Sequence, residues 1–135
     1  HVHQLPIISK IFVKAIRDIY KKDKPFVRNT GLDFKIIFFN NQKIIKSCIM
    51  SLIGKLFKAK LKKNMIPTNS YFFGIYDFKN IDKFEKNIKL YFKFKNKNSI
   101  IMVHPGYVDK EIKKLDSLTE QRFYEYQYLK NLNFI

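Results

Sequence analysis

The sequence predicts an α/β fold in which short parallel strands alternate with amphipathic helices. Two long segments, residues 6–20 and 44–57, carry apolar residues spaced three and four apart, which is typical of helices with one apolar face. A continuous apolar run, Ser99–Val103, is typical of a strand that is buried on both faces. A proline lies downstream of each segment and limits how far it can continue.

Local signals define the elements in the first half of the chain. Pro6 suits the first turn of the first helix, and Pro25 lies beyond its end. Phe26–Arg28 is short and predicts a strand. A second helix is expected from Gln42 to Lys63, and its far end is strongly basic.

Local signals also define the second half. Tyr71–Tyr76 is aromatic and fits either a strand or a substrate loop. Asn80 can cap a third helix, and Ser117–Glu120 has the capping-box pattern that predicts a last helix. The sequence shows no internal repeat and no low-complexity linker, so residues 1–135 are expected to form one domain.

The charge of the chain first suggests a nucleic-acid binder, because 27 Lys and Arg face 11 Asp and Glu, a formal net charge of +16. However, 24 of the cations are Lys and only 3 are Arg, the residue that forks onto phosphate and guanine. Lys, Ile, Asn and Phe make up 68 of the 135 residues, and all four have AT-rich codons. Compositional bias explains the charge at least as well, so nucleic acid is not the expected partner.

Other classes are excluded by composition. No run of about 18 uncharged apolar residues exists, so no transmembrane helix is expected. Cys48 is the single cysteine, which excludes an intramolecular disulfide and a cysteine-based zinc site. We find no targeting pattern and expect a cytoplasmic protein. The chain opens at His1 without Met, and its two ends look cut, so a fragment of a longer protein is expected.

Histidines stand where strands should end, and active sites of parallel α/β folds lie at the carboxyl ends of strands. His104 follows the apolar run directly and could act as a general acid or base, although it equally fits a plain strand end. Gly106 would let a ligand approach closely. His1 and His3 would share one face of a strand and could reach one metal, or they are a truncation remnant.

Four motifs resemble those of the YdjC-like carbohydrate deacetylases (the ChbG/HpnK family). His1–Pro6 resembles the tail of the family's Ser-His-x-His-Val-His motif, and Met102–Asp109 resembles its His-Pro-Gly motif. Pro25–Arg28 resembles the family's strand that ends in Arg, while Arg122 and Glu125 match its downstream Arg-x-x-Glu helix. The resemblance covers essentially the whole chain in order.

This resemblance implies a metal-dependent enzyme that removes N-acetyl groups from amino sugars, on a partial, distorted (β/α) barrel. The family's metal, Mg or Zn, is held by one Asp and two His. All three ligands would lie before His1, so no residue of this chain is assigned as a metal ligand. The chain then corresponds to the C-terminal part of the family, and alone it is expected neither to bind the metal tightly nor to turn over substrate.

The resemblance also implies roles for individual residues. His104 would be the general acid, while His1 and His3 would lie near the metal without binding it. Arg28, Tyr107 and Gly106 would bind the substrate. A surface salt bridge is the alternative for Arg28, and core packing is the alternative for Tyr107. Two carboxylates downstream are expected to cap helices rather than to act in catalysis: Asp109 and Asp116.

The leading interpretation is therefore a carbohydrate deacetylase with an N-acetylated sugar as substrate. A Lys-rich module that binds nucleic acid or an anionic membrane is the alternative, because the segment from Gln42 to Lys63 is amphipathic and basic. A sugar-binding pseudoenzyme is a third interpretation. The sequence leaves open the sugar, the metal and the oligomeric state, with a homodimer as one option.

Overall fold

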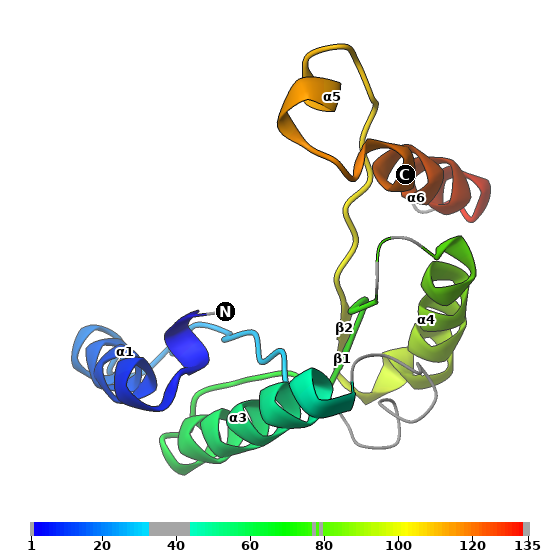
Figure 1. Ribbon diagram of the computed structural model, residues 1–135. Coiled ribbons are helices and arrows are strands. Elements are labelled where there is room, and N and C mark those ends of the chain that lie inside the picture. The colour runs from blue at the N-terminus through cyan, green and yellow to red at the C-terminus, as the bar shows by residue number, and fades with distance from the viewer. Residues whose placement is uncertain (1, 33–43, 77, 79, 134–135) are drawn as a thin grey trace. The chain divides into compact units, whose positions relative to one another are not determined.

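The computed structural model describes residues 2–32, 44–76, 78 and 80–133 (Figure 1). The chain divides into two compact units. The first comprises His1–Phe72 and Lys93–Ile100, and the second comprises Phe73–Phe92 and Ile101–Ile135.

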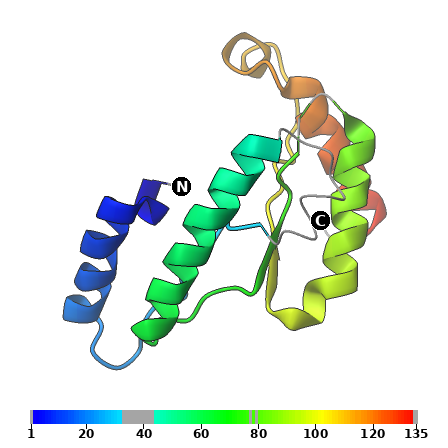
Figure 2. The same cartoon turned by 60° about the horizontal axis from the view of Figure 1, so that its bottom comes forward.

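The first unit is built on two helices that lie side by side, α1 (Pro6–Ile19) and α3 (Ile44–Lys63) (Figures 1 and 2). The bounds confirm both helices that the apolar spacing predicts. Proline occupies the first turn of α1, where its missing N–H leaves no donor unpaired. The core between the helices consists of six buried apolar residues: Val13, Ile16, Val27, Phe57, Leu61 and Ile66.

Small and polar side chains bring these two helices close together. Ser9 of α1 is buried, and its hydroxyl accepts a hydrogen bond of 2.5 Å from the ammonium of Lys60. Much of the apolar stripe is instead exposed on α1, where Ile7 is 77% and Ile11 is 67% exposed. The periodicity therefore identifies an apolar stripe correctly but does not tell which part of it is buried.

Gly54 lets the backbone of α3 approach a neighbouring segment. A Cβ on Gly31 would lie 2.8 Å from the Gly54 Cα, and a Cβ on Gly54 would overlap the Gly31 Cα. The side-chain amide of Asn29 bridges this approach, because it donates to the Gly54 carbonyl at 2.7 Å and accepts from the Gly31 N–H at 2.6 Å. The approach depends on the absence of a side chain at both glycines.

We predict that Gly54→Ala lowers the free energy of unfolding by about 1–3 kcal/mol, because an added methyl group in a filled site forces the backbone apart. Helix propensity alone predicts the opposite sign, a gain of about 1 kcal/mol for alanine in a helix. Ala59→Gly, at an exposed position of the same helix, measures that propensity by itself. Urea denaturation of both variants checks the prediction, and a stabilised Gly54→Ala protein would contradict the close approach.

The predicted strand at Phe26–Arg28 is reduced to one parallel bridge between Val27 and Thr68. The Val27 N–H donates to the Pro67 carbonyl at 2.8 Å. The side chain of Asn69 extends this link, since it accepts from the Asn29 N–H at 2.7 Å and donates to the Asn29 carbonyl at 2.8 Å. A side-chain amide thus supplies hydrogen bonds that a longer strand would have made with its backbone.

Two short parallel strands are formed, β1 (Tyr71–Phe73) and β2 (Ser99–Ile101), and they pair with each other. They confirm the mixed α/β class and its parallel strands, and β2 is shorter than the expected Ser99–Val103. Among the described residues the sheet has these two strands and does not close on itself. The barrel implied by the resemblance therefore stays a prediction.

The second unit packs helix α4 (Ile81–Phe94) against helix α6 (Thr119–Asn131) (Figure 2). Its buried core contains Tyr76, Phe84, Ile88 and Leu129. Gly74 leads from β1 into this unit with φ +92°, a conformation that side chains disfavour, and its N–H donates to the Asn87 amide oxygen at 3.2 Å.

Two aspartates expected to cap helices bind backbone N–H groups near a helix start, although neither is the cap residue of its helix. Asp109 accepts the Ile112 N–H at 2.7 Å at the start of the short helix α5 (Ile112–Leu115), which the sequence does not predict. Asp116 accepts the Leu118 N–H at 2.9 Å just before α6. The predicted capping box at Ser117–Glu120 is wrong, because Leu118 occupies the cap position and makes no side-chain cap.

None of the helices in the described part of the chain is both long enough and apolar enough to cross a membrane.

Candidate active site

The position of His104 is fixed by a hydrogen bond from its backbone N–H. It follows β2, and its N–H donates to the Oε2 atom of Glu125 in α6 at 2.5 Å. Two residues later, the Gly106 N–H donates to the carbonyl oxygen of Arg122 at 3.1 Å. These two bonds fix the His-Pro-Gly segment to α6, so the histidine lies beyond a strand end, as the sequence predicts, and is supported by a helix.

Glu125 connects three segments of the second unit. Its side chain is fully buried, Oε2 accepts the His104 N–H, and Oε1 accepts the hydroxyl of Tyr76. Burial, followed by the hydrogen bond to Glu125, raises the pKa of Tyr76 well above its usual range. The phenol therefore remains protonated and continues to donate to the carboxylate. The carboxyl group of Glu125 in α6 therefore binds two other segments. One is the chain that follows β1, through Tyr76, and the other is the loop that follows β2, through His104.

The His104 imidazole packs against an aromatic ring, and one of its ring nitrogens is buried without a hydrogen-bond partner among the described residues. Its ring meets the ring of Phe78 edge to face, with centroids 5.3 Å apart. The Nδ1 atom is buried, and among the described residues it has no hydrogen-bond partner. A buried polar atom without a partner is costly, so each one needs an explanation such as a bound water or a functional role. The ring is thus placed where a further group could complete its hydrogen bonding.

A charged pair lies beside the same loop. The Arg122 Nε atom donates to the Oδ2 atom of Asp116 at 2.6 Å. The backbone hydrogen bond from Leu118 and then the bond from Arg122 lower the pKa of the Asp116 carboxyl. Asp116 is therefore held as a negative charge by Arg122 and the Leu118 N–H.

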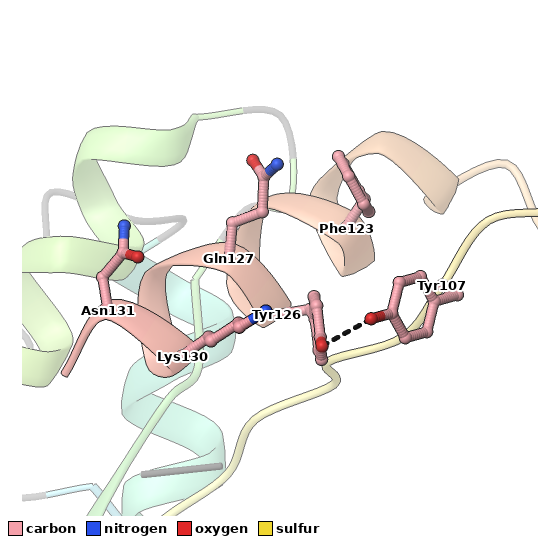
Figure 3. A pocket seen from close by; sticks show the side chains of 6 residues that line it. All are labelled: Tyr107, Phe123, Tyr126, Gln127, Lys130 and Asn131. Atoms are coloured by element: carbon pink, nitrogen blue, oxygen red, sulfur yellow. Dashed lines mark hydrogen bonds between the residues drawn. The ribbon is translucent and has the colours of Figure 1, made fainter. Parts of the chain in front are cut away.

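The side chain of Tyr107 lies away from the cluster formed by His104, Glu125 and Tyr76, and it lines a pocket (Figure 3). Its hydroxyl lies 2.5 Å from that of Tyr126, and the ring centroids are 4.4 Å apart. The pocket has a volume of about 440 Å³. Six side chains line it: Tyr107, Phe123, Tyr126, Gln127, Lys130 and Asn131. His104 does not line this pocket, so the structure separates two residues that the sequence places in one site.

Two other predicted site residues lie in the first unit. Arg28 has an exposed side chain, and its carbonyl oxygen lies 3.3 Å from the Nε2 atom of His3. The His3 ring packs against Phe12 and Phe57, with centroids 5.3 and 5.4 Å away. His3 belongs to a 3₁₀ turn, Val2–Gln4, rather than to the expected strand end.

The donor atoms of the described residues do not fit a divalent metal. No group of three or more His, Cys, Asp or Glu side chains is found among them. The 3₁₀ turn also removes the alternation by which His1 and His3 would share a strand face, and His1 itself lies outside the described residues. Among the described residues, His3 and His104 therefore have no cluster of carboxylates or further histidines around them that could hold such an ion.

Sequence reasoning missed two contacts of this cluster, Tyr76 and Phe78. The Arg-x-x-Glu motif includes Glu125. However, Tyr76, whose hydroxyl donates a hydrogen bond to this glutamate, lies 49 residues away in the chain. One signal was available, because Gln121, Glu125 and Leu129 are spaced four apart and lie on one helix face. Because Glu125 shares a helix face with the apolar Leu129, its carboxylate can be expected to be buried. A buried carboxylate then needs a hydrogen-bond donor from another segment.

The described chain is thus a mixed α/β protein in which a histidine beyond a strand end is bound through its backbone N–H to a buried glutamate. Residues 1–134 match the model of the family described as YdjC-like protein, so the chain belongs to that family. Membership implies a carbohydrate deacetylase-type function. No curated protein matches the chain, and no solved structure matches it.

Proposed function

We propose that this chain contributes the proton-donating part of a carbohydrate N-deacetylase site, with His104 as the general acid. The observation that carries the proposal is the hydrogen bond from the His104 N–H to Glu125, which holds the residue beyond a strand end, while Nδ1 has no partner in the described part of the chain. Family membership supplies the substrate class, an N-acetylated amino sugar.

The reaction needs one proton at the nitrogen. Water adds to the acetyl carbon and forms a C–O bond, and the resulting tetrahedral intermediate then breaks its C–N bond. The electron pair of that bond passes to the nitrogen, which takes a proton from the imidazolium of His104, and the proton that the attacking water loses restores the imidazolium. Nε2 is the ring nitrogen that we assign to this transfer, because Nδ1 is enclosed. The acetic acid released passes its proton to the amine, so the products are acetate and the ammonium form of the amino sugar.

Neighbouring residues support this assignment. Asp116 and Arg122 form an ion pair of 2.6 Å beside the same loop. Gly106 has no side chain, and its N–H donates to the Arg122 carbonyl at 3.1 Å, which fixes the loop that follows His104. Arg28 remains the proposed holder of the substrate or of a catalytic carboxylate.

Larger features of the family remain proposals for this chain. We propose that residues 1–135 form part of one barrel-like domain, and that a divalent metal polarises the acetyl carbonyl. Since the described residues do not fit such an ion, its ligands would have to come from other residues.

The proposal is tested by acetate release from di-N-acetylchitobiose, using the natural gene product that contains this chain, with Mg²⁺ or Zn²⁺ supplied. We expect one free amine for each acetate released. The contradicting outcome is no acetate from a panel of N-acetylated amino sugars, together with binding of duplex DNA that weakens steeply with salt, as the Lys-rich alternative requires.

A further inference from the structure

The outer face of α6 carries aromatic side chains next to amide and ammonium groups. Five residues spaced three and four apart form it: Phe123, Tyr126, Gln127, Lys130 and Asn131. An α-helix has about 3.6 residues per turn, so this face lies roughly opposite the one that carries Glu125 and Leu129. The side chains of the outer face and Tyr107 line a pocket of about 440 Å³ that is open to solvent (Figure 3).

The size of this pocket suits a small ligand, because known small-molecule sites span about 300–1,000 Å³. Its aromatic rings are accessible, since Tyr107 is 65% and Phe123 is 38% exposed. The hydrogen bond between Tyr107 and Tyr126 is the main cause that raises the pKa of Tyr107, so the Tyr107 phenol stays protonated at neutral pH. The pocket therefore presents uncharged rings and hydroxyl groups to solvent.

The remaining lining residues supply directional polar groups. Gln127 and Asn131 each carry an amide that both donates and accepts, and Lys130 carries an ammonium that only donates. A pyranose ring has an apolar C–H face and a rim of hydroxyl groups, and it matches this combination of aromatic rings and amides. A purely apolar ligand would leave the amides and the ammonium without partners.

We infer that the outer face of α6 is a second saccharide-binding site, separate from the His104 cluster. Glu125 holds the His104 backbone from the opposite face of the helix, so a sugar in this pocket is not the sugar that receives the proton. An oligosaccharide bound at this second site would stay close to His104. The effective concentration of the oligosaccharide at the reacting centre would therefore rise.

The inference is tested by titrating di-N-acetylchitobiose into the ¹⁵N-labelled 135-residue chain and following its amide resonances. We expect the largest shifts at Tyr107, Tyr126 and Gln127. Tyr126→Ala should weaken binding by about tenfold or more, because it removes an aromatic contact surface. Tyr126→Phe, which removes the hydroxyl alone, should weaken binding less.

Two further variants keep the test decisive. The double variant Gln127→Ala with Asn131→Ala changes exposed positions only and should also weaken binding, even if Tyr126→Ala fails to fold. Lys114→Gln, at an exposed position outside the pocket, should bind the disaccharide as the unaltered chain does. The inference is overturned if no resonance of the pocket shifts, or if the pocket variants bind the disaccharide as tightly as the unaltered chain does. Because the titration needs no turnover, its result is independent of the proposed deacetylase activity.

Discussion

Glu125→Ala is expected to lower the free energy of unfolding by about 2–4 kcal/mol, because each of two buried donors left without an acceptor costs about 1–3 kcal/mol. Those donors are the Tyr76 hydroxyl and the His104 N–H. Removing a buried carboxylate also removes its own desolvation penalty, which offsets part of the loss. Chemical denaturation measures the change. The His104 amide proton resonance should also move upfield, since it loses a hydrogen bond to a carboxylate.

The matched control is Glu120→Ala, an exposed glutamate in the first turn of the same helix. It should cost no more than about 0.3–1 kcal/mol, the usual contribution of a charge near a helix end. Tyr76→Phe removes only one of the two donors and should fall between the two glutamate variants. Equal losses for Glu125→Ala and Glu120→Ala would show that the buried carboxylate does not tie these segments together.

His104→Gln is expected to lower kcat for an N-acetyl sugar by about 10²–10⁴-fold, the usual contribution of a positioned general acid. Glutamine keeps the backbone N–H that donates to Glu125, so the loop should stay in place while the proton donor is lost. The KM should change much less than kcat, because the imidazole acts on the leaving nitrogen and not on binding. Lys114→Gln, at an exposed position of α5, is the control and should leave kcat unchanged.

The position of His104 could be predicted from the sequence because its determinants are local. An apolar run ends at Val103, and the next three residues cannot extend a strand. The location of Tyr107 could not be predicted in this way, although it lies only three residues further on. Its side chain reaches Tyr126 because of the side on which the loop crosses α6, and no local spacing encodes that choice.

The buried surface of the helices shows a similar limit. The spacing of Ile49, Leu52 and Leu56 predicts a helix correctly, yet these three side chains are between 54% and 58% exposed. The buried residues include Ser51 and Gly54, because small side chains permit the close backbone approach at Gly31. A pattern of apolar residues identifies a helix, whereas the face that packs also depends on the shape of its neighbour.

The lysine content gains a structural explanation in the first unit. Lys24 donates to the Asn64 carbonyl at 2.7 Å, Lys58 donates to the Ser70 carbonyl at 2.8 Å, and Lys60 reaches Ser9. These ammonium groups satisfy backbone and hydroxyl acceptors within the fold. Such roles agree with a compositional origin of the +16 charge and do not require a polyanionic partner.

The role of His104 is tested most directly by comparing two substrates with the His104→Gln form of the natural gene product. An N-acetyl sugar expels an amine that must be protonated, whereas 4-nitrophenyl acetate expels a phenolate that leaves without a proton. We predict a loss of about 10²-fold or more for acetate release from di-N-acetylchitobiose and a much smaller loss for the ester. Equal losses for both substrates, or no loss for the sugar, would contradict the assignment of His104 as the general acid.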